Sequence, residues 1–274
     1  MILYIMFCSQ IELNPRKVKK MSRKLFCLAV VVIVIGTICV SAYLASAAPQ
    51  GKGNDRVLSK ITFIHYRKAY GKPPWAGGGN GGGKDKKEGY YSYLAKGAKW
   101  KEIEDYILNP ENNDGASKTL VKNAVAEGMD EWETPEDKTF IIFGNIEIDN
   151  TVEYNDGAYR GYNTISFGIY DNPDVIAIAS VWGYFTGPPS QREIVEAHIL
   201  MNDGDFEWGN GSVNPSIMDV QNIVTHELGH CAGMGDVYEL AAAEETMYGY
   251  SSEGEIKKRD LYKGDITGIT QLYK

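Results

Sequence analysis

The sequence predicts an α+β domain, because strand-like and helix-like segments follow one another along the same chain. Several segments rich in Ile, Val and Phe are bounded by Asn, Asp, Gly and Pro, as strands commonly are. Two segments place apolar residues at helical spacing instead. With 274 residues and no internal repeat, the chain has room for one domain of ordinary size plus leader sequences. We therefore expect a twisted mixed β-sheet with helices packed on it.

The elements are expected in the following order. Residues 100–108 are predicted to form the first strand, and residues 116–133 an amphipathic helix whose apolar side chains belong to the core. Four further strands are predicted, at residues 139–148, 164–169, 175–182 and 194–201. A second helix, described next, follows the last of these strands.

This second helix carries the residues from which function is predicted. His226 and His230 are four residues apart and face the same way on a helix, so both can reach one metal ion. Glu227 lies beside them without being a natural ligand. Gly233 can adopt the left-handed conformation that ends a helix, and the reversed chain can return Asp236 as a third ligand. In a continuous helix Asp236 would lie about 9 Å beyond His230, too far to share the ion.

The start and the buried face of this helix are also predicted. Ser216 and Asp219 form a pair resembling a capping box, so the helix is expected to begin near residue 216. Its apolar stripe lies nearly opposite the two histidines and consists of Ile217, Val220, Val224, Leu228 and Cys231. The helix can therefore bury one side and present the histidines to a cleft. The alternative is a surface helix with two solvated histidines.

These residues resemble the metzincin zinc endopeptidases, and among them the matrixins, whose pattern is H-E-x-x-H-x-x-G-x-x-H followed by a methionine turn. Residues 246–250 (Thr-Met-Tyr-Gly-Tyr) resemble that turn, in which the sulfur of Met247 would pack beneath the metal site. Residues 265–273 resemble the closing matrixin helix, and residues 192–202 the strand before the zinc helix. The resemblance implies a zincin-like fold with a small C-terminal subdomain, covering residues from about 90 onward.

The resemblance also implies a reaction. Zinc held by His226, His230 and Asp236 would keep one position for water, and Glu227 would act as the general base that hydrolyses a peptide bond. Polypeptides would be the substrates, with an extended peptide pairing to an edge strand within residues 175–182. Tyr248 and Tyr250 either line the pocket after the scissile bond or simply pack. The alternative function is a catalytically weak or inactive exported zinc-binding interaction module.

Three departures from the family pattern stand out. The third ligand is Asp236 where matrixins have histidine, a choice that snapalysin-like metzincins share. Gly249 stands where astacin-like members have a tyrosine ligand, so no fifth ligand is expected there. Only His65 and His198 remain for the structural zinc site of animal matrixins, so that site is expected to be missing, and His198 is interpreted as a structural residue.

The N-terminal region predicts export. Arg23 and Lys24 precede an apolar run at residues 25–44, and Ala45-Ser46-Ala47 has the form of a cleavage site. Residues 1–47 are thus either a cleaved signal peptide or an anchor that keeps the catalytic domain outside the cell membrane. The protein is expected to be secreted or membrane-anchored. Met21 is an alternative start of this leader.

Residues 48–88 are interpreted as a basic stalk or short propeptide with a glycine-rich linker at residues 77–83. The segment 61–70 has strand character and contains His65. It either folds back on the acidic cleft as an inhibitor or belongs to a solvated stalk. No cysteine lies between Ala47 and the catalytic domain, so a cysteine switch is absent.

Charge and cysteine content narrow the partners of the predicted catalytic domain, residues 89–274. From Gly89 onward the chain has 13 Lys or Arg against 32 Asp or Glu, a net charge of −19 that argues against nucleic-acid binding. The loops at residues 171–174 and 202–205 offer several oxygens, as Ca²⁺ sites do, or are ordinary turns. Cys231, the one cysteine of this part, is interpreted as a small apolar residue.

Overall fold

The computed structural model describes residues 56–68, 89–135, 139–154 and 158–274, all within one unit that spans Asp55–Lys274. The predicted leader (1–47), its apolar run (25–44) and the glycine-rich linker (77–83) lie outside the described residues. Within the described part of the chain, no helix combines the length and the apolar character needed to cross a membrane. The predicted domain boundaries and membrane anchor therefore stay predictions.

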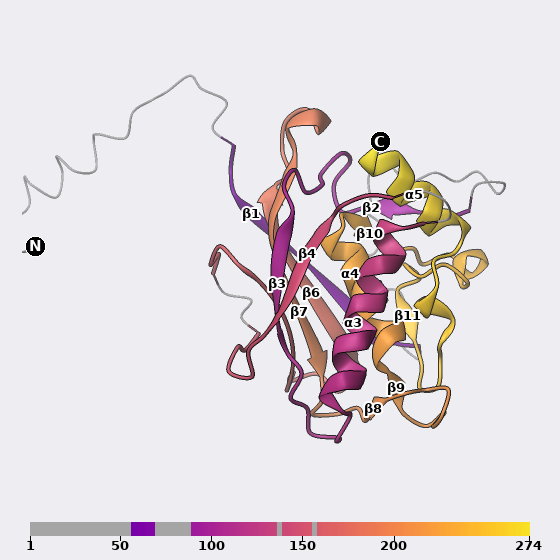
Figure 1. Cartoon of the computed structure of the whole chain (residues 1–274). Helices are drawn as coiled ribbons and strands as arrows, with labels where there is room; N and C mark the ends of the chain where they lie inside the picture. Colours follow the sequence, from indigo (N-terminus) through magenta and orange to yellow (C-terminus); the bar gives the residue numbers. More distant parts are fainter. Residues whose placement is uncertain (1–55, 69–88, 136–138, 155–157) are drawn as a thin grey trace, which may run out of the picture. The chain divides into compact units, whose positions relative to one another are not determined.

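A seven-stranded mixed sheet forms the frame of the fold (Figure 1). Its strands lie in the order β11-β1-β6-β7-β5-β3-β4. The strands are β1 (Ser59–Arg67), β3 (Glu104–Asn109), β4 (Phe143–Ile148), β5 (Asn163–Gly168), β6 (Val175–Tyr184), β7 (Glu193–Asn202) and β11 (Tyr250–Ser251). β6 runs antiparallel to both of its neighbours, β7 and β1, while β7, β5, β3 and β4 are mutually parallel. The twisted mixed sheet predicted from the sequence is confirmed.

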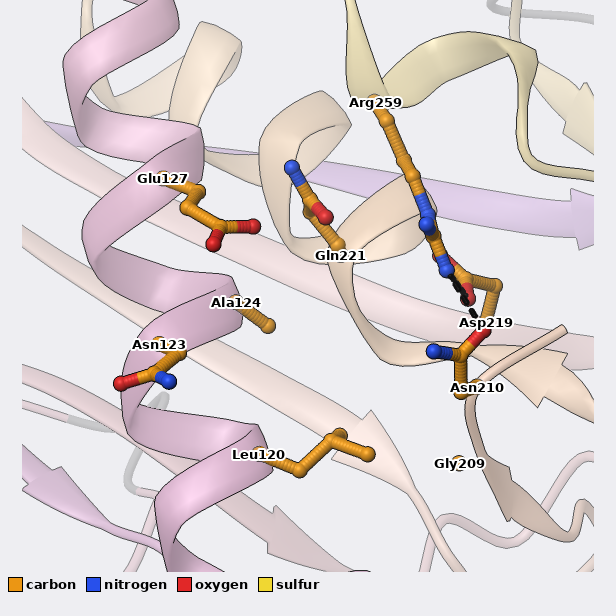
Figure 2. A pocket seen from close by; sticks show the side chains of 9 residues that line it. All are labelled: Leu120, Asn123, Ala124, Glu127, Gly209, Asn210, Asp219, Gln221 and Arg259. Atoms are coloured by element: carbon orange, nitrogen blue, oxygen red, sulfur yellow. Dashed lines mark hydrogen bonds and ion pairs between the residues drawn. The ribbon is translucent and has the colours of Figure 1, made fainter. Parts of the chain in front are cut away.

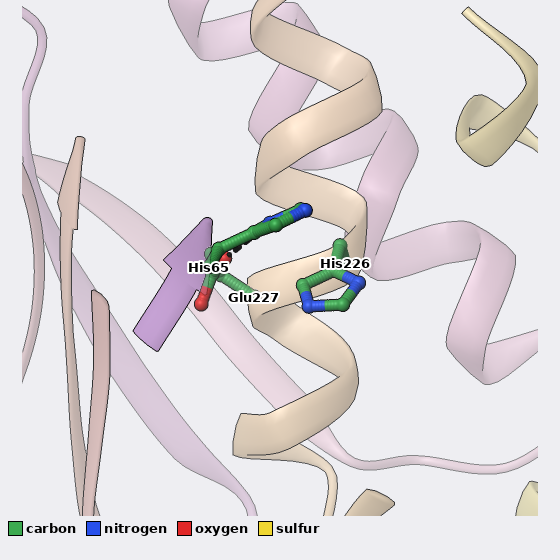
Figure 3. A group of neighbouring side chains, drawn as sticks. All are labelled: His65, His226 and Glu227. Atoms are coloured by element: carbon green, nitrogen blue, oxygen red, sulfur yellow. Dashed lines mark hydrogen bonds and ion pairs between the residues drawn. The ribbon is translucent and has the colours of Figure 1, made fainter. Parts of the chain in front are cut away.

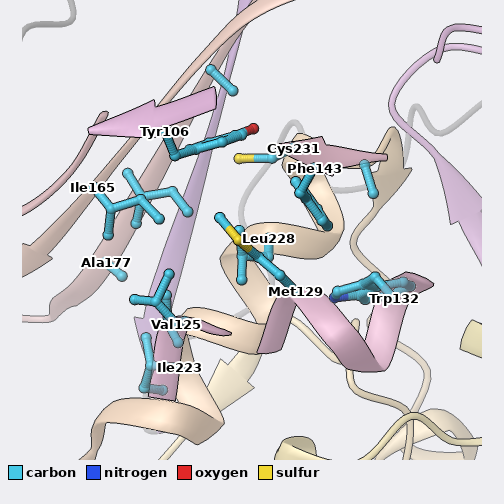
Figure 4. Packing of buried hydrophobic residues seen from close by; sticks show 14 of the residues in the cluster. Tyr106, Val125, Met129, Trp132, Phe143, Ile165, Ala177, Ile223, Leu228 and Cys231 are labelled. Carbon is cyan, nitrogen blue, oxygen red and sulfur yellow. The ribbon is translucent and has the colours of Figure 1, made fainter. Parts of the chain in front are cut away.

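Two helices, α3 (Lys118–Glu133) and α4 (Val220–Cys231), cover one face of this sheet (Figure 1). They pack on each other, α4 also contacts β6 and β7, and α3 contacts β4. The main core lies between these helices and the sheet, and Figure 4 shows some of its side chains. Those fully buried include Tyr106, Val125, Trp132, Ile165 and Leu228. A third helix, α5 (Lys263–Tyr273), closes the chain as expected from residues 265–273.

The predicted elements are present, but two strands begin later than expected. The first, β3, starts at Glu104, because Trp100 lies outside the sheet with its indole N–H donated to the Cys231 carbonyl at 2.8 Å. β4 starts at Phe143, because the Glu133 carboxylate accepts the backbone N–H of residues 142 and 143 and ends α3 beside the strand. Both positions are fixed by side chains distant in sequence.

The start of α4 corrects the predicted capping box. Asp219 itself is the N-cap and accepts the Asn222 N–H at 2.8 Å, while the helix begins at Val220. Residues 218–219 (β9) pair in parallel with residues 208–209 (β8), which prevents an earlier helical turn. Arg259 also forms an ion pair with Asp219 beside a pocket between α3 and the start of α4, as Figure 2 shows. Ile217 therefore lies outside the helix.

The position of β1 decides between the two alternatives for the segment 61–70, which were a fold back on the cleft and a solvated stalk. Residues 59–67 form a strand within the sheet, paired antiparallel to β6 over its length and parallel to β11 at its end. The register places Thr62 opposite Ser180 and His65 opposite Ala177. This part of the basic segment is thus folded into the sheet and is not a solvated stalk.

Candidate active site

The two histidines of α4 are held by backbone carbonyls. His226 Nδ1 lies 2.7 Å from the Thr246 carbonyl, and His230 Nδ1 lies 3.1 Å from the Met234 carbonyl. Each carbonyl can only accept, so Nδ1 carries the proton and Nε2 keeps its lone pair. Both side chains are essentially fully buried. A neutral ring that donates its Nδ1 proton and keeps the Nε2 lone pair is a form in which histidine binds a metal.

The chain reverses after α4 as the sequence predicts. Gly233 has φ +104°, and a Cβ atom there would come within 2.6 Å of the Ala98 carbonyl oxygen. The next two residues form a short strand, β10 (Met234–Gly235), paired with β2 (Ser92–Tyr93). This pairing directs Asp236 back toward the helix, so that its Oδ1 lies 3.3 Å from His226 Nε2 and 3.4 Å from His230 Nε2.

These three atoms fit a metal ion. His226 Nε2 and Asp236 Oδ1 are buried and have no hydrogen-bond partner, a costly state for polar atoms unless a ligand satisfies them. The other carboxylate oxygen of Asp236 accepts a hydrogen bond from the Tyr238 hydroxyl at 3.0 Å, which orients Oδ1 toward the imidazoles. His226, His230 and Asp236 form one of two groups among the described residues that could hold a metal ion. Two imidazoles and one carboxylate are a donor set typical of catalytic zinc.

The charges of the three groups agree with this interpretation. Burial lowers the pKa of His226 to about 4, so its ring is neutral at physiological pH. Burial alone would raise the pKa of Asp236, but the adjacent His230 and His226 rings hold it well below its ordinary value. Burial would lower the pKa of His230, but the Asp236 carboxylate outweighs it and raises that pKa. The site therefore carries an anionic carboxylate facing two imidazoles.

Glu227 lies on the same helix between the histidines and is fully buried. Burial raises its pKa to about 8, a range useful to a group that takes and returns a proton near neutral pH. Its Oε2 has no hydrogen-bond partner, whereas its Oε1 lies 3.0 Å from His65 Nδ1. Glu227 does not belong to the group with Asp236; it forms the second possible metal-ligating group together with His65 and His226.

Met247 lies beneath α4. A Cβ atom added at Gly229 would collide with the Met247 sulfur, so the two residues are in direct contact. Asp265, at the start of α5, accepts the backbone N–H of Thr246 at 2.6 Å and of Met247 at 3.1 Å. The same Thr246 supplies the carbonyl that holds His226, so α5 supports the metal cluster through this turn.

β1 lies across the site. The ring of Phe63 stacks on that of His230, with centroids 3.8 Å apart and an angle of 8° between the planes. The ring of His65 lies 3.9 Å from that of His226, and Figure 3 shows it beside both His226 and Glu227. β1 also pairs with β6, the strand predicted to bind an extended peptide. The chain's own segment therefore takes the place expected for a substrate.

Lys258 closes the far side of the His65 ring. It lies in a short 3₁₀ helix, η4 (Lys257–Arg259), and is completely buried. Its ammonium donates to the Tyr248 carbonyl, to the Tyr250 carbonyl at 3.0 Å and to His65 Nε2 at 3.2 Å. Burial lowers the pKa of Lys258 to about 8. A buried ammonium group therefore lies within hydrogen-bonding distance of His65, which in turn contacts His226 and Glu227.

The other residues singled out from the sequence do not belong to the group formed by His226, His230 and Asp236. His198 is buried in β7, with its ring nitrogens 2.8 Å from Glu196 Oε1 and 2.7 Å from Thr164 Oγ1, as expected of a structural residue. Cys231 is a fully buried apolar neighbour of the core. Neither acidic loop, 171–174 or 202–205, belongs to a metal-ligating group among the described residues, so the calcium expectation is not supported. Tyr248 and Tyr250 are both buried.

Several residues of this site have no clear functional signal in the sequence. Tyr238 could have been found from its position two residues after Asp236. Phe63 and His65 lie in a segment for which the sequence leaves two alternatives, folding back on the cleft as an inhibitor or a solvated stalk, but it does not predict their ring contacts with His230 and His226. Lys258 and Asp265 had no sequence signal, because their roles depend on how the C-terminal segment packs against α4.

Comparison with known proteins agrees with this geometry. The matrixin family model, of peptidase family M10, matches residues 99–274, which is more than half of the chain. No curated protein matches the chain. The matched region contains α4, the turn at Met247 and the closing helix α5. The chain therefore belongs to the matrixin family of zinc metallopeptidases.

Proposed function

We propose that this protein is an exported zinc-dependent endopeptidase in which Glu227 acts as the general base. The observation that carries the proposal is the convergence of His226 Nε2, His230 Nε2 and Asp236 Oδ1, two of which are buried atoms without a partner. These three residues would hold the zinc ion. The bound ion would lower the pKa of a water molecule and polarise the carbonyl of the bond to be cleaved.

The protein's own residues perform the remaining tasks. Glu227, with its raised pKa, accepts a proton from the attacking water and delivers it to the leaving amine. Its Oε2, which has no hydrogen-bond partner, is available for this transfer. The backbone edge of β6 holds an extended peptide by strand pairing, a mode that depends little on sequence. Met247 and Asp265 keep the turn that holds His226 in place.

The alternative, an inactive exported zinc-binding module, is less well supported. A structural zinc site is usually closed by four protein ligands and needs no base. Here a buried carboxylate with a raised pKa lies next to three candidate ligands. The surroundings of Glu227 therefore favour catalysis.

Peptide hydrolysis requires β1 to leave the cleft. β1 pairs with the side of β6 opposite β7, Phe63 stacks on the His230 ring, and the His65 ring lies tilted against that of His226 and contacts the proposed base. A substrate peptide and β1 would therefore compete for the same place. The enzyme is therefore latent in the conformation described, and latency needs no cysteine.

The test is chelator-sensitive cleavage of casein by the zinc-loaded full chain carrying Phe63→Ala and His65→Ala, which loosen β1 without altering the proposed ligands. We expect cleavage that a zinc chelator abolishes and added zinc restores. Zinc binding without any cleavage would favour the interaction module instead.

A further inference from the structure

Two polar groups contact the ring nitrogens of His65, one a hydrogen-bond donor and the other an acceptor. We call the space that this ring fills the His65 pocket. Lys258 Nζ lies 3.2 Å from His65 Nε2, and Glu227 Oε1 lies 3.0 Å from His65 Nδ1. An ammonium can only donate, so Nε2 must accept and Nδ1 carries the proton that is donated to Glu227. As a neutral ring, His65 thus donates a hydrogen bond to Glu227 and accepts one from Lys258 at the same time.

The ammonium of Lys258 is fully engaged only while an acceptor fills the pocket. It has three protons, and its acceptors are the Tyr248 carbonyl, the Tyr250 carbonyl and His65 Nε2. The nearest carboxylate, Glu255, is 4.0 Å away. An aliphatic occupant would leave one buried donor without a partner, which costs more than the net gain from an ordinary hydrogen bond.

The direction of β1 connects this pocket with substrates. β1 runs antiparallel to β6 over its length and pairs with β11 only through its last two residues, so its backbone adds to β6 as an extended peptide ligand would. Alternate residues of a strand share one face, and Phe63 and His65 both face the α4 histidines. A peptide bound along β6 in the same way would place its own side chain between Glu227 and Lys258.

We propose that Lys258 is a specificity-determining residue of the cleft, which selects peptides that place a His or Gln side chain in the pocket now filled by His65. Glutamine offers the same pair of groups as the neutral imidazole, an N–H for Glu227 and an oxygen for Lys258. Glutamate would satisfy Lys258 but has no N–H to donate to Glu227 Oε1, and leucine would satisfy neither. This inference rests on the proposed function, since it assigns the pocket to a substrate side chain.

The first experiment uses the chain's own strand as the ligand. Amide hydrogen exchange of residues 59–67 is measured in the zinc-loaded full chain and in its His65→Gln and His65→Leu variants. We expect His65→Gln to keep most of the protection, and His65→Leu to lose about tenfold or more, the size of a hydrogen bond to a charged group. Equal protection in the two variants would overturn the proposal.

A second pair of variants assigns the effect to Lys258. In the Lys258→Met background the difference between His65→Gln and His65→Leu should shrink to the part that the hydrogen bond to Glu227 contributes, while in the Lys257→Met background it should persist in full. Lys257 is the matched control because it neighbours Lys258 in η4 but contacts Glu244 and the Ala243 carbonyl instead. A difference that Lys258→Met leaves undiminished would also overturn the proposal. The comparison of the two His65 variants needs no change at Lys258, so it remains informative if that variant does not fold.

A peptide series separates this inference from the proposed activity. Copies of residues 59–67 with His, Gln, Glu or Leu at the sixth to eighth positions in turn are tested for binding to, and cleavage by, the Phe63→Ala/His65→Ala full chain. Graded binding without cleavage would contradict the peptidase and leave the pocket assignment standing. Cleavage of all peptides with no preference for His or Gln would contradict the pocket assignment and leave the peptidase standing.

Discussion

His65 Nδ1 lies 3.0 Å from Glu227 Oε1, although 162 residues separate them in the sequence. The contact joins the proposed general base to a strand that precedes the matched matrixin region. The base is thus partly engaged by the chain itself, which links the chemistry of the site to the position of β1. The chemistry of the site and the position of β1 can be tested separately.

Substitution Glu227→Gln should reduce peptide cleavage by about 100-fold or more, the usual range for loss of a general base. Zinc content should be unchanged, because Glu227 is not in the cluster with Asp236. Cleavage is measured with a labelled casein and zinc by elemental analysis, both in the Phe63→Ala/His65→Ala background. Glu244→Gln, at an exposed carboxylate, is the control. Full activity of Glu227→Gln would exclude the proposed base.

Substitution Asp236→Ala should weaken zinc binding more than Tyr238→Phe does. Asp236 would lose a ligand oxygen, whereas Tyr238→Phe removes only the hydroxyl that orients it. Loss of such an orienting partner typically costs about 10–100-fold in metal affinity. Competition with a chromogenic chelator measures both affinities. If Asp236→Ala retained its zinc through exhaustive dialysis, Asp236 could not be a ligand.

Loosening β1 should activate the enzyme. The pair Phe63→Ala and His65→Ala removes two ring contacts, each worth about 0.5–1.5 kcal/mol, and two hydrogen bonds. We expect the initial rate of casein cleavage to rise about tenfold or more at equal zinc content. Val57→Ala, at an exposed residue just before β1, should leave the rate unchanged. No increase in the double variant would show that β1 does not compete with substrate.

Substitution Gly233→Ala should destabilise the fold and weaken zinc binding together. Alanine at φ +104° is strained by about 1–3 kcal/mol, and its Cβ would also press on the Ala98 carbonyl oxygen. Gly115→Ala is the matched control, since Gly115 also has positive φ but no atom within 4 Å of an added Cβ. Urea unfolding gives the free energy of unfolding of each variant. A smaller loss at Gly233 than at Gly115 would contradict this explanation of the turn.

Export can be tested independently of the site. We expect the chain to be recovered outside the cytoplasm, with a mature N-terminus at Ala48 if the leader is cleaved. Recovery in the membrane fraction with residues 25–44 intact would favour the anchor, since that run is just long enough to span a bilayer. Cell fractionation followed by N-terminal sequencing separates these outcomes, and a cytoplasmic location would contradict both.

The elements determined locally were predicted well from the sequence. Helical spacing gave α3, and β6 and β7 were each placed to within two residues of their bounds. The spacing of His226, His230, Gly233 and Asp236 also gave the turn, because helical periodicity and the backbone freedom of glycine act over a few residues. The predicted capping box was wrong, because pairing between β8 and β9 and the ion pair with Arg259 position Asp219.

The sequence by itself determined that His226, His230 and Asp236 come together, since their spacing sets their geometry within about two helical turns. That they hold zinc and hydrolyse a peptide bond stays a prediction. The tertiary structure alone decided what surrounds Glu227. Phe63, His65 and Lys258 reach the site from β1 and η4, and contacts so distant in sequence arise from sheet pairing and packing, which leave no periodic signal. Strand character predicted that residues near 61 could pair, but only the tertiary structure decided that they pair with β6, on the side opposite β7.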